Sequence, residues 1–362
     1  MEGANIKRVG NLYEEIYSFE NLFEAFLMAR KKKKDRREVL EFTANLEENL
    51  IELQNELIHH TYKVGEYYEF FVNEQKRRMV MALPFRDRVV QWAIYRVVNP
   101  IFESQFYEHS YACRVGKGTH SAANKLQEWL KIVEKRPDKY YYLKMDISKY
   151  FYRVDHEILI KMIRKRVKDE EVLSLLTLII KSEDTDFGLP VGSSLIEVTD
   201  RESDTGMPIG NLTSQMFANI YLNELDKFVK HALKTHFYAR YMDDFIILSD
   251  DKSELHDFKN QIIVFLDDEL RLQTNNKTCV RPTALGIEFV GYKIWATHKK
   301  IRKSTTKRVR KKLRFTQKQY ARGEITAEKV SQTVQSCFAV FDNADSKLLK
   351  EKFSKTYVFT KG

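Results

Sequence analysis

The stretch Tyr241-Met242-Asp243-Asp244-Phe245-Ile246-Ile247-Leu248 decides the fold, because it places two adjacent acids inside an apolar run. The apolar residues on both sides predict two short strands, spanning Phe237–Leu248, around an acidic turn. An Asp-Asp pair on its own is ordinarily a surface turn. Carboxylates beside a buried strand are costly without a partner, and adjacent ones repel each other. The apolar flanks therefore predict that a further group compensates this charge.

A third acid, Asp146, ends another predicted strand, Tyr140–Met145. The hairpin tip can face this acid from a neighbouring strand, which would bring Asp146, Asp243 and Asp244 together. Three carboxylates without a nearby His or Cys suit hard divalent cations, foremost Mg²⁺, with Mn²⁺ as an alternative. Two such ions, roughly 3.5–4 Å apart, are what in-line nucleotidyl transfer requires. We therefore predict that these three aspartates are catalytic and hold two Mg²⁺ ions.

The composition agrees with a folded protein that binds a polyanion. The 362 residues include 61 Lys and Arg against 51 Asp and Glu, a net charge of +10, and 43% are hydrophobic. This apolar content permits a packed core, and the length fits two or three subdomains. No apolar run approaches the ~20 residues that span a bilayer, so no membrane partner is expected. Met1–Gly10 lacks a signal-peptide core, and Cys113, Cys279 and Cys337 are scattered, which predicts a cytoplasmic protein.

Periodicity outlines the remaining elements. The sequence predicts a hairpin with a polar tip and one further strand, and it predicts an irregular loop or small strand insertion over Ser182–Thr205. Pro100 is expected to bend or divide its helix. The predicted helices are Leu12–Arg30, Val39–His60, Arg86–Phe106, Val172–Lys181 and Met216–Ala232, the hairpin strands are Tyr68–Val72 and Arg78–Leu83, and the further strand is Phe289–Trp295.

Two segments concentrate the positive charge. Lys31–Arg37 has six basic residues in seven, and it is either a solvated helix end or a phosphate contact. Lys299–Lys318 has eleven Lys and Arg and no acid, with only a thin apolar stripe. This second segment predicts the start of a basic helical domain.

At this point the motifs resemble those of reverse transcriptases. The tetrapeptide Tyr241–Asp244 is similar to their signature, and Lys144–Phe151 is similar to their first palm motif. Further motifs resemble bacterial enzymes related to group II intron proteins, and the ordered matches extend over roughly residues 11 to 295. These further motifs are Pro84–Gln91, Ser110–His120, Leu270–Lys277 and Gly286–Tyr292.

The stretch Gly206–Gln215 points to a subgroup. Most reverse transcriptases have Gln where this chain has Ile209 and Pro where it has Gln215. The departure resembles the enzymes of diversity-generating retroelements, which copy a template RNA with errors, particularly opposite adenine, and work with a small basic accessory protein. Anti-phage defence and retron reverse transcriptases share much of this core and remain alternatives. A non-catalytic RNA-binding scaffold is a rival of another class, although a scaffold has no use for three mutually repelling acids.

The resemblance implies an α+β fold of the right-hand polymerase class. It implies an N-terminal helical extension (residues 1–62) and fingers with the first palm elements (63–139). A palm with an antiparallel sheet (140–295) would follow, with a finger insertion near 157–205, and then a basic helical thumb (296–362). The implied partners are template RNA, the cDNA product and dNTPs.

It also implies roles for single residues. The carbonyl of Ile147 would be a further metal ligand, and Lys76 and Arg78 would meet the incoming triphosphate. Phe151 would exclude a 2′-hydroxyl, unless it is ordinary core packing, and Lys277 would protonate the leaving pyrophosphate, unless it is a solvated loop lysine. Ile209, Gly210 and Gln215 complete the expected nucleotide site. The residues expected to grip nucleic acid are Arg302, Lys303, Lys307, Arg308, Arg310, Lys311 and Arg314.

Overall fold

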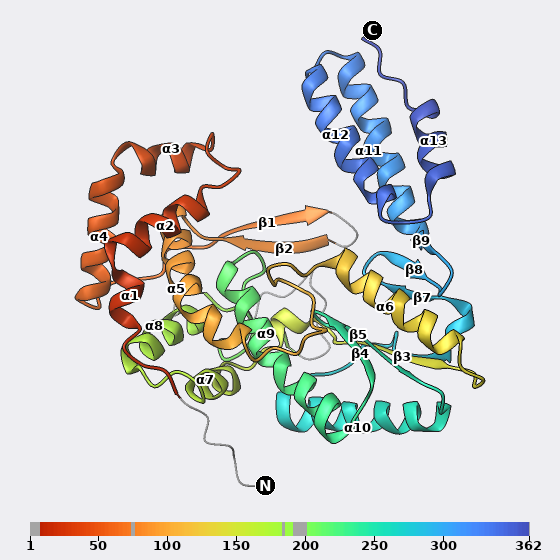
Figure 1. Ribbon diagram of the computed structural model, residues 1–362. Coiled ribbons are helices and arrows are strands. Elements are labelled where there is room, and N and C mark those ends of the chain that lie inside the picture. The colour runs from red at the N-terminus through yellow and green to blue at the C-terminus, as the bar shows by residue number, and fades with distance from the viewer. Residues whose placement is uncertain (1–7, 74–76, 183–184, 191–200, 362) are drawn as a thin grey trace. The chain divides into compact units, whose positions relative to one another are not determined.

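The chain forms two compact units that are interleaved along the sequence. The computed structural model describes residues 8–73, 77–182, 185–190 and 201–361 (Figure 1). Unit 1 comprises Met1–Cys113, Ile147–Lys234 and Asn260–Asn276, and unit 2 comprises Arg114–Asp146, Thr235–Lys259 and Lys277–Gly362. None of the described helices is long and apolar enough to cross a lipid bilayer.

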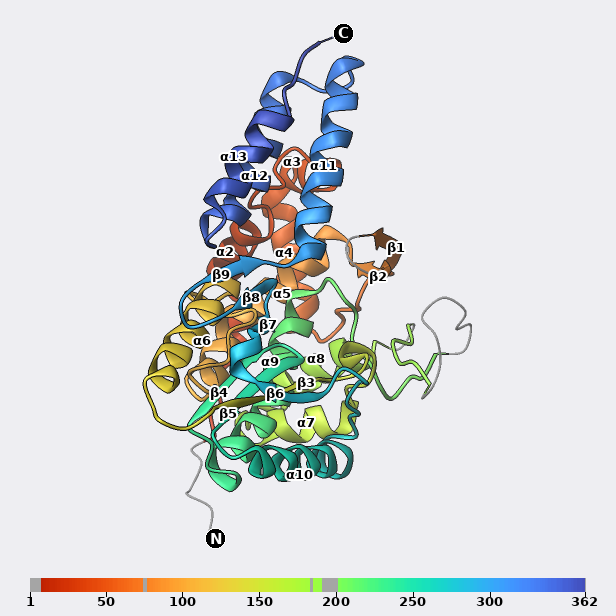
Figure 2. The ribbon, with the colours of Figure 1, turned by 90° about the vertical axis from the view of Figure 1, so that its right-hand side faces the viewer.

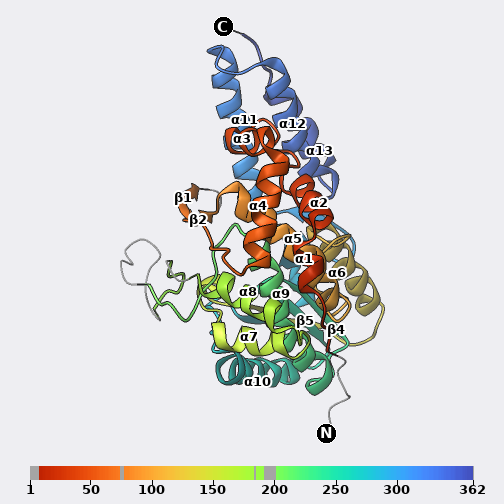
Figure 3. The same ribbon diagram turned by 90° about the vertical axis from the view of Figure 1, so that its left-hand side faces the viewer.

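Helices dominate unit 1, and its N-terminal helices pack around α5, as Figure 3 shows. Leu22 and Phe26 of α2 are fully buried, and Asn21 donates to the carbonyl of Ala93 in α5. The helix α5 continues through Pro100 without dividing. The helix predicted over Leu12–Arg30 is divided into α1 (Tyr13–Tyr17) and α2 (Phe19–Ala29), because Ser18 is extended and caps α2. The helix predicted over Val39–His60 is likewise divided at Asn45 into α3 (Arg37–Ala44) and α4 (Leu46–Ile58), whereas the third is confirmed as α5 (Phe85–Glu103).

The rest of unit 1 is a hairpin and three more helices. The predicted hairpin is confirmed as the antiparallel pair β1 (Tyr68–Asn73) and β2 (Arg77–Ala82). The helices are α7 (His156–Arg164), α8 (Glu170–Lys181) and α9 (Leu212–Lys227), and α9 ends in a π-helical turn over Phe228–Ala232. The helix α10 (Lys252–Leu270) begins in unit 2 and ends in unit 1. The predicted irregular loop over residues 182–205 lies partly outside the described residues.

Unit 2 is built on a four-stranded antiparallel sheet in the order β4-β5-β3-β6 (Figure 2). Alternate residues of a strand point to the same side of a sheet, and on one face the central strands β3 and β5 are buried, with no exposed surface on Leu143, Phe245 or Ile247. The strands are β3 (Tyr141–Asp146), β4 (Phe237–Tyr241), β5 (Asp244–Ser249) and β6 (Cys279–Pro282), which confirms the two predicted strands around the acidic turn; α6 (Thr119–Glu134) precedes them.

The prediction of a single strand over Phe289–Trp295 was wrong. That segment contributes to a three-stranded sheet of β7 (Ile287–Phe289), β8 (Tyr292–Ile294) and β9 (Lys299–Ile301). A two-residue turn separates β7 from β8, with φ of 42° at Val290 and 92° at Gly291. Two successive positive φ angles give a hairpin of the primed type, whose twist matches that of the strands.

Three helices follow this small sheet: α11 (Lys303–Ala321), α12 (Ala327–Asp342) and α13 (Lys347–Thr356), which lie side by side in Figure 1. Thr305, Val309 and Leu313 are buried along one stripe of α11, as expected for residues four apart on a helix. The exposed face of α11 is basic. The mixture of helices and antiparallel strands in both units confirms the predicted α+β class.

Candidate active site

Two of the three predicted carboxylates lie directly opposite each other. Asp146 at the end of β3 pairs with Asp244 at the start of β5 in an antiparallel register. Cross-strand partners of this kind share one face of the sheet. Asp243 belongs to the two-residue turn between β4 and β5, because Tyr241 pairs with Asp244 across it. The structure therefore confirms the hairpin geometry that the sequence predicted.

Asp243 lies in a strained turn that is held by the buried side chain of Arg240. Met242, the first residue of the turn, has a φ of 56°, in the left-handed region that side chains ordinarily avoid. Arg240 has no exposed surface, and its Nη1 donates to the carbonyl oxygen of Met242 at 3.1 Å. Backbone strain of this kind costs about 1–3 kcal/mol and persists where surrounding contacts fix it. The Arg240 guanidinium provides such a contact beneath the turn.

The Asp244 carboxylate is held on one oxygen only. Its Oδ2 accepts a hydrogen bond from Nζ of Lys144 at 2.8 Å, and its side chain is 21% exposed. Its Oδ1 is buried and has no hydrogen-bond partner among the described residues. Burial raises the pKa of Asp244, Lys144 opposes this rise, and Asp146 adds to it. A divalent cation would offset the free-energy cost of burying this charge, because it would neutralise the two facing carboxylates and Oδ1 would be one of its ligands.

The donor set therefore fits a hard cation, although the complete site is not assembled. Facing carboxylate oxygens are the ligands that Mg²⁺ prefers. In the described part of the chain, however, no three His, Cys, Asp or Glu side chains lie close enough together to hold a metal ion. The structure thus brings Asp146 and Asp244 together and leaves Asp243 beside them in the turn. Three-carboxylate coordination stays a prediction.

A cavity of about 600 Å³ opens at these carboxylates within unit 2. Lys277, predicted to act on the pyrophosphate, lines the same cavity as Asp146 and Asp244. Three other cations that line it, Lys144, Arg281 and Lys293, were not predicted as site residues. Lys144 is detectable in retrospect, because it lies two residues before Asp146 and so on the same face of β3. The full lining is Tyr142, Lys144, Asp146, Asp244, Lys277, Cys279, Arg281, Leu285, Gly286, Glu288, Lys293 and Arg302.

In unit 1, a network of backbone hydrogen bonds fixes the segment that carries Ile209. Phe151 lies in a short 3₁₀ turn, Tyr150–Tyr152, and its carbonyl accepts from the amide of Met207 at 2.6 Å. The carbonyl of Ile209 accepts from the amide of Met81 in β2 at 3.0 Å. Gly210 has a φ of 126°, and a Cβ there would come within 3.0 Å of Val80. Ile209 is thus held at the edge of the β1–β2 hairpin.

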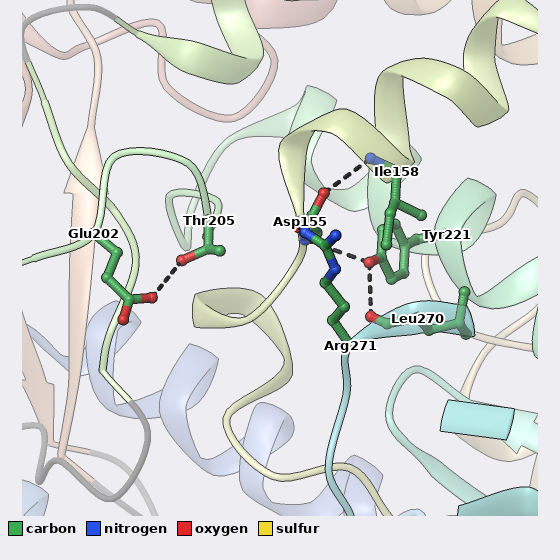
Figure 4. Close-up of polar contacts among 7 residues, drawn as sticks. All are labelled: Asp155, Ile158, Glu202, Thr205, Tyr221, Leu270 and Arg271. Carbon is green, nitrogen blue, oxygen red and sulfur yellow. Dashed lines mark hydrogen bonds and ion pairs between the residues drawn. The ribbon is translucent and has the colours of Figure 1, made fainter. Parts of the chain in front are cut away.

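Asp155 anchors the base of the same segment (Figure 4). Its Oδ1 accepts from the amide of Ile158 at the start of α7, and its Oδ2 accepts from Nη1 of Arg271 at 2.6 Å. Tyr221 donates to the carbonyl of Leu270 at 2.8 Å in the same close-up. Asp155 also forms a β-bridge with Thr205, so the start of the segment is fixed to α7.

The other predicted nucleotide residues also lie in unit 1. Arg78 is exposed on β2, Gln215 is half-buried on α9, and Ile147 is buried and forms a β-bridge with Thr274. Lys76 lies outside the described residues. The carboxylates and Lys277 belong to unit 2, so the roles assigned across the two units stay predictions.

Most predicted nucleic-acid contacts lie on the basic face of α11. The exposed residues on this face are Lys303, Lys307, Arg308, Arg310, Lys311 and Arg314. Arg310 also lies over the Phe353 ring at 5.9 Å, which joins α11 to α13. Arg302 differs from the rest, because it precedes α11 and lines the cavity at Asp146.

Comparison with known families agrees with the palm motifs. Residues 69–294 match the family described as reverse transcriptase (RNA-dependent DNA polymerase). The chain belongs to the reverse transcriptase family. The family predicted from the motifs is therefore confirmed. An RNA-directed DNA polymerase is the enzyme class of this family.

Several known proteins are similar to this chain. Protein YkfC of Escherichia coli K12 is 26% identical over 242 residues, covering 58% of this chain and 61% of its own length. The group II intron-encoded protein LtrA of Lactococcus lactis is 28% identical over 158 residues, covering 43% of this chain and 24% of its own. A telomerase structure of Candida tropicalis has a TM-score of 0.47 at 13% identity, covering 85% of this chain and 59% of that one. This chain thus spans less than two thirds of each.

Proposed function

We propose that this chain is an RNA-directed DNA polymerase that adds deoxynucleotides to a 3′-hydroxyl. The observation that carries the proposal is the facing pair of Asp146 and Asp244, with Asp243 in the adjoining turn, in a chain of the reverse transcriptase family. Bound Mg²⁺ would activate the attacking hydroxyl and neutralise charge on the leaving phosphate. Asp146, Asp243 and Asp244 would hold these ions.

The other predicted site residues would bind and orient the substrates. Arg78 would meet the triphosphate through its planar guanidinium, which suits bidentate phosphate contact. Phe151 would press against the sugar and exclude a 2′-hydroxyl. Lys277 would give a proton to the leaving pyrophosphate, since it lines the cavity at Asp146.

The substitution Asp243→Asn tests this proposal. It keeps the shape of the side chain and removes the charge, so DNA synthesis on a primed RNA template should fall by about a hundredfold or more. Asp250→Asn is the matched control, because Asp250 is an exposed acid just after β5. Unchanged synthesis by the Asp243 variant would favour a non-catalytic RNA-binding scaffold instead.

We also propose that the copying is error-prone and serves a diversity-generating retroelement. Ile209 and Gln215 support this subgroup, and template RNA, cDNA, dNTPs and a small basic accessory protein would be its partners. The neighbouring DNA distinguishes the subgroup from a defence or retron enzyme. A pair of template and variable repeats that differ at adenines is expected, and a dedicated noncoding RNA gene without such repeats would contradict the assignment.

A further inference from the structure

The ammonium group of Lys144 connects the four-stranded sheet β4-β5-β3-β6 to the β7–β8 hairpin. Nζ of Lys144 donates to Oδ2 of Asp244 at 2.8 Å and to the backbone carbonyl of Glu288 at 2.6 Å. The side chain of Lys144 is 15% exposed, and its Nζ lies 5.9 Å from the centre of the Phe289 ring. A compact ammonium has three donors, so it can serve two acceptors on different elements at once.

The hairpin end of this connection is itself fixed. Nε of Arg302 lies 3.4 Å from Oε2 of Glu288, and the amide of Arg302 donates to the carbonyl of Gly291 in the hairpin turn at 3.2 Å. Arg302 immediately precedes α11. The contacts therefore run from Asp244 through Lys144 and Glu288 to Arg302, the residue before α11, entirely within unit 2.

This arrangement determines how Asp244 can face a ligand. One carboxylate oxygen is bound to Lys144, and the other is buried without a hydrogen-bond partner among the described residues. An unconstrained aspartate samples several rotamers, whereas an ion pair with a half-buried lysine selects one of them. The Lys144 contact therefore fixes the direction in which Oδ1 points.

We propose that Lys144 is a positioning residue for Asp244 and for the β7–β8 hairpin. Because the same ammonium binds both, the carboxylate and the backbone of Glu288 keep a fixed relative position. A displacement of the hairpin would move Asp244 with it. The importance of that position for catalysis rests on the proposed function, but the linkage between Lys144 and Asp244 does not.

A double-mutant cycle on the metal-free protein tests the linkage. Unfolding in EDTA is compared for the wild type, Lys144→Met, Asp244→Asn and the double variant. Lys144→Met should lower the folding equilibrium constant at least about fivefold more when Asp244 is present than when it is substituted. The control is Lys125→Met with Glu128→Gln, an exposed ion pair of 3.0 Å in the same unit, where coupling should stay below about twofold. Equal effects of Lys144→Met in both backgrounds would overturn the proposal.

Steady-state kinetics test the positioning role. With primed RNA, Lys144→Met should lower kcat about tenfold and change the KM for dNTP little, because binding is retained and the reactive geometry is lost. Lys144→Arg keeps the charge and should recover most of kcat, whereas Lys144→Gln keeps only a donor and should recover less. Equal kcat for all variants would overturn the positioning role.

The two experiments separate two different failures. If Lys144→Met does not fold, the comparison of the Arg and Gln variants with the wild type still decides the order of kcat values. If the wild type synthesises no DNA, the proposed function fails, and the unfolding cycle still measures the contact between Lys144 and Asp244.

Discussion

Ile209 is one of the two residues, with Gln215, on which the proposed subgroup rests. Its carbonyl is bonded to the amide of Met81, so the position of its half-buried side chain is fixed by β2. An isoleucine can only pack against a nucleotide, whereas a glutamine can also form hydrogen bonds with it. Loss of such a contact removes about 1–3 kcal/mol of discrimination, which corresponds to roughly tenfold or more in fidelity.

We therefore expect Ile209→Gln to lower the error rate opposite template adenine roughly tenfold. The measurement is sequencing of cDNA copied from a defined template RNA. Ile209→Val is the control, because it keeps an apolar side chain and should leave the error rate unchanged. An adenine error rate that is the same in all three proteins would contradict the role of this residue.

Gly206 begins the segment that carries Ile209, and its conformation permits no side chain. Its φ is 92°, and a Cβ would lie 2.6 Å from the backbone of Phe187 and Gly188. Gly206→Ala should therefore lower the free energy of unfolding by about 3 kcal/mol, measured by urea denaturation. Gly323→Ala shares the positive φ, at 71°, but meets no atom within 4 Å. It should cost only about 1 kcal/mol, and equal losses would refute the steric explanation.

His156 makes the stability of this segment depend on pH. Its Nε2 donates to the carbonyl of Gly206 at 2.7 Å, and its Nδ1 is buried without a partner among the described residues. Burial lowers the pKa of His156 below its ordinary value of 6.5, against the opposing effect of the Gly206 hydrogen bond. The unfolded chain therefore takes up a proton more readily than the folded one, and stability falls as the pH drops below 6.5.

The predicted effect of His156 on stability can be measured by urea denaturation at pH 7.5 and pH 5.5. The wild type should lose more free energy of unfolding over this interval than His156→Gln, which keeps a donor for Gly206 but does not titrate. The same loss in both proteins would show that other groups cause the pH dependence.

At the scale of elements, α11 carries exposed basic residues on one side and buried apolar residues on the other. Lys307, Lys311 and Arg314 are exposed, while Val309 and Leu313 are buried. Replacing those three cations by Gln should weaken binding to primed RNA. It should also reduce the magnitude of the negative slope of log K against log salt by about 2–3. The control is the same change at Lys347, Lys352 and Lys355 of α13, which should alter the slope less. A salt titration with an unchanged slope for the α11 variant would place the duplex elsewhere.

Periodicity predicted the elements whose own residues carry the signal. β5 has a continuous apolar run and that of β3 is interrupted only by Lys144, and the sequence predicted their acidic ends to face each other. β9 was not predicted, because Lys299–Ile301 is mostly basic and becomes a strand only through pairing with β8. The turn at Val290 was also missed, since a valine rarely adopts a positive φ and the backbone of the folded hairpin imposes it.

For the site, too, residues with a local sequence pattern were predicted, and contacts between distant residues were not. The three aspartates Asp146, Asp243 and Asp244 could be predicted as cation ligands, because carboxylates at the ends of apolar strands are recognisable in the sequence. The contact of Lys144 with Asp244 joins residues 100 apart, and its contact with Glu288 joins residues 144 apart. Such contacts depend on side-chain conformation and strand register, which no local pattern encodes.

At the scale of the whole molecule, acidic and basic side chains are concentrated on different elements, and we expect them to have different roles. Carboxylates lie at one end of the four-stranded sheet, and cations cover the exposed face of α11. Chelation with EDTA should therefore stop DNA synthesis but leave primed RNA bound, since basic side chains supply that binding. Raising salt from 50 to 200 mM should release the RNA in the presence of Mg²⁺ as well. Release by EDTA alone, followed by a gel-shift assay, would contradict this division.

The interleaving of the units affects how the chain is made on the ribosome. The chain passes between them after residues 113, 146, 234, 259 and 276. β3 (Tyr141–Asp146) is translated about 100 residues before its central partner β5 (Asp244–Ser249), which is roughly 5–20 s at ordinary elongation rates. Until then Leu143 and Met145 have no sheet to cover them. Nascent chains at this stage are therefore the ones most prone to aggregate, and expression of this protein should depend on chaperones that bind β3 during that interval.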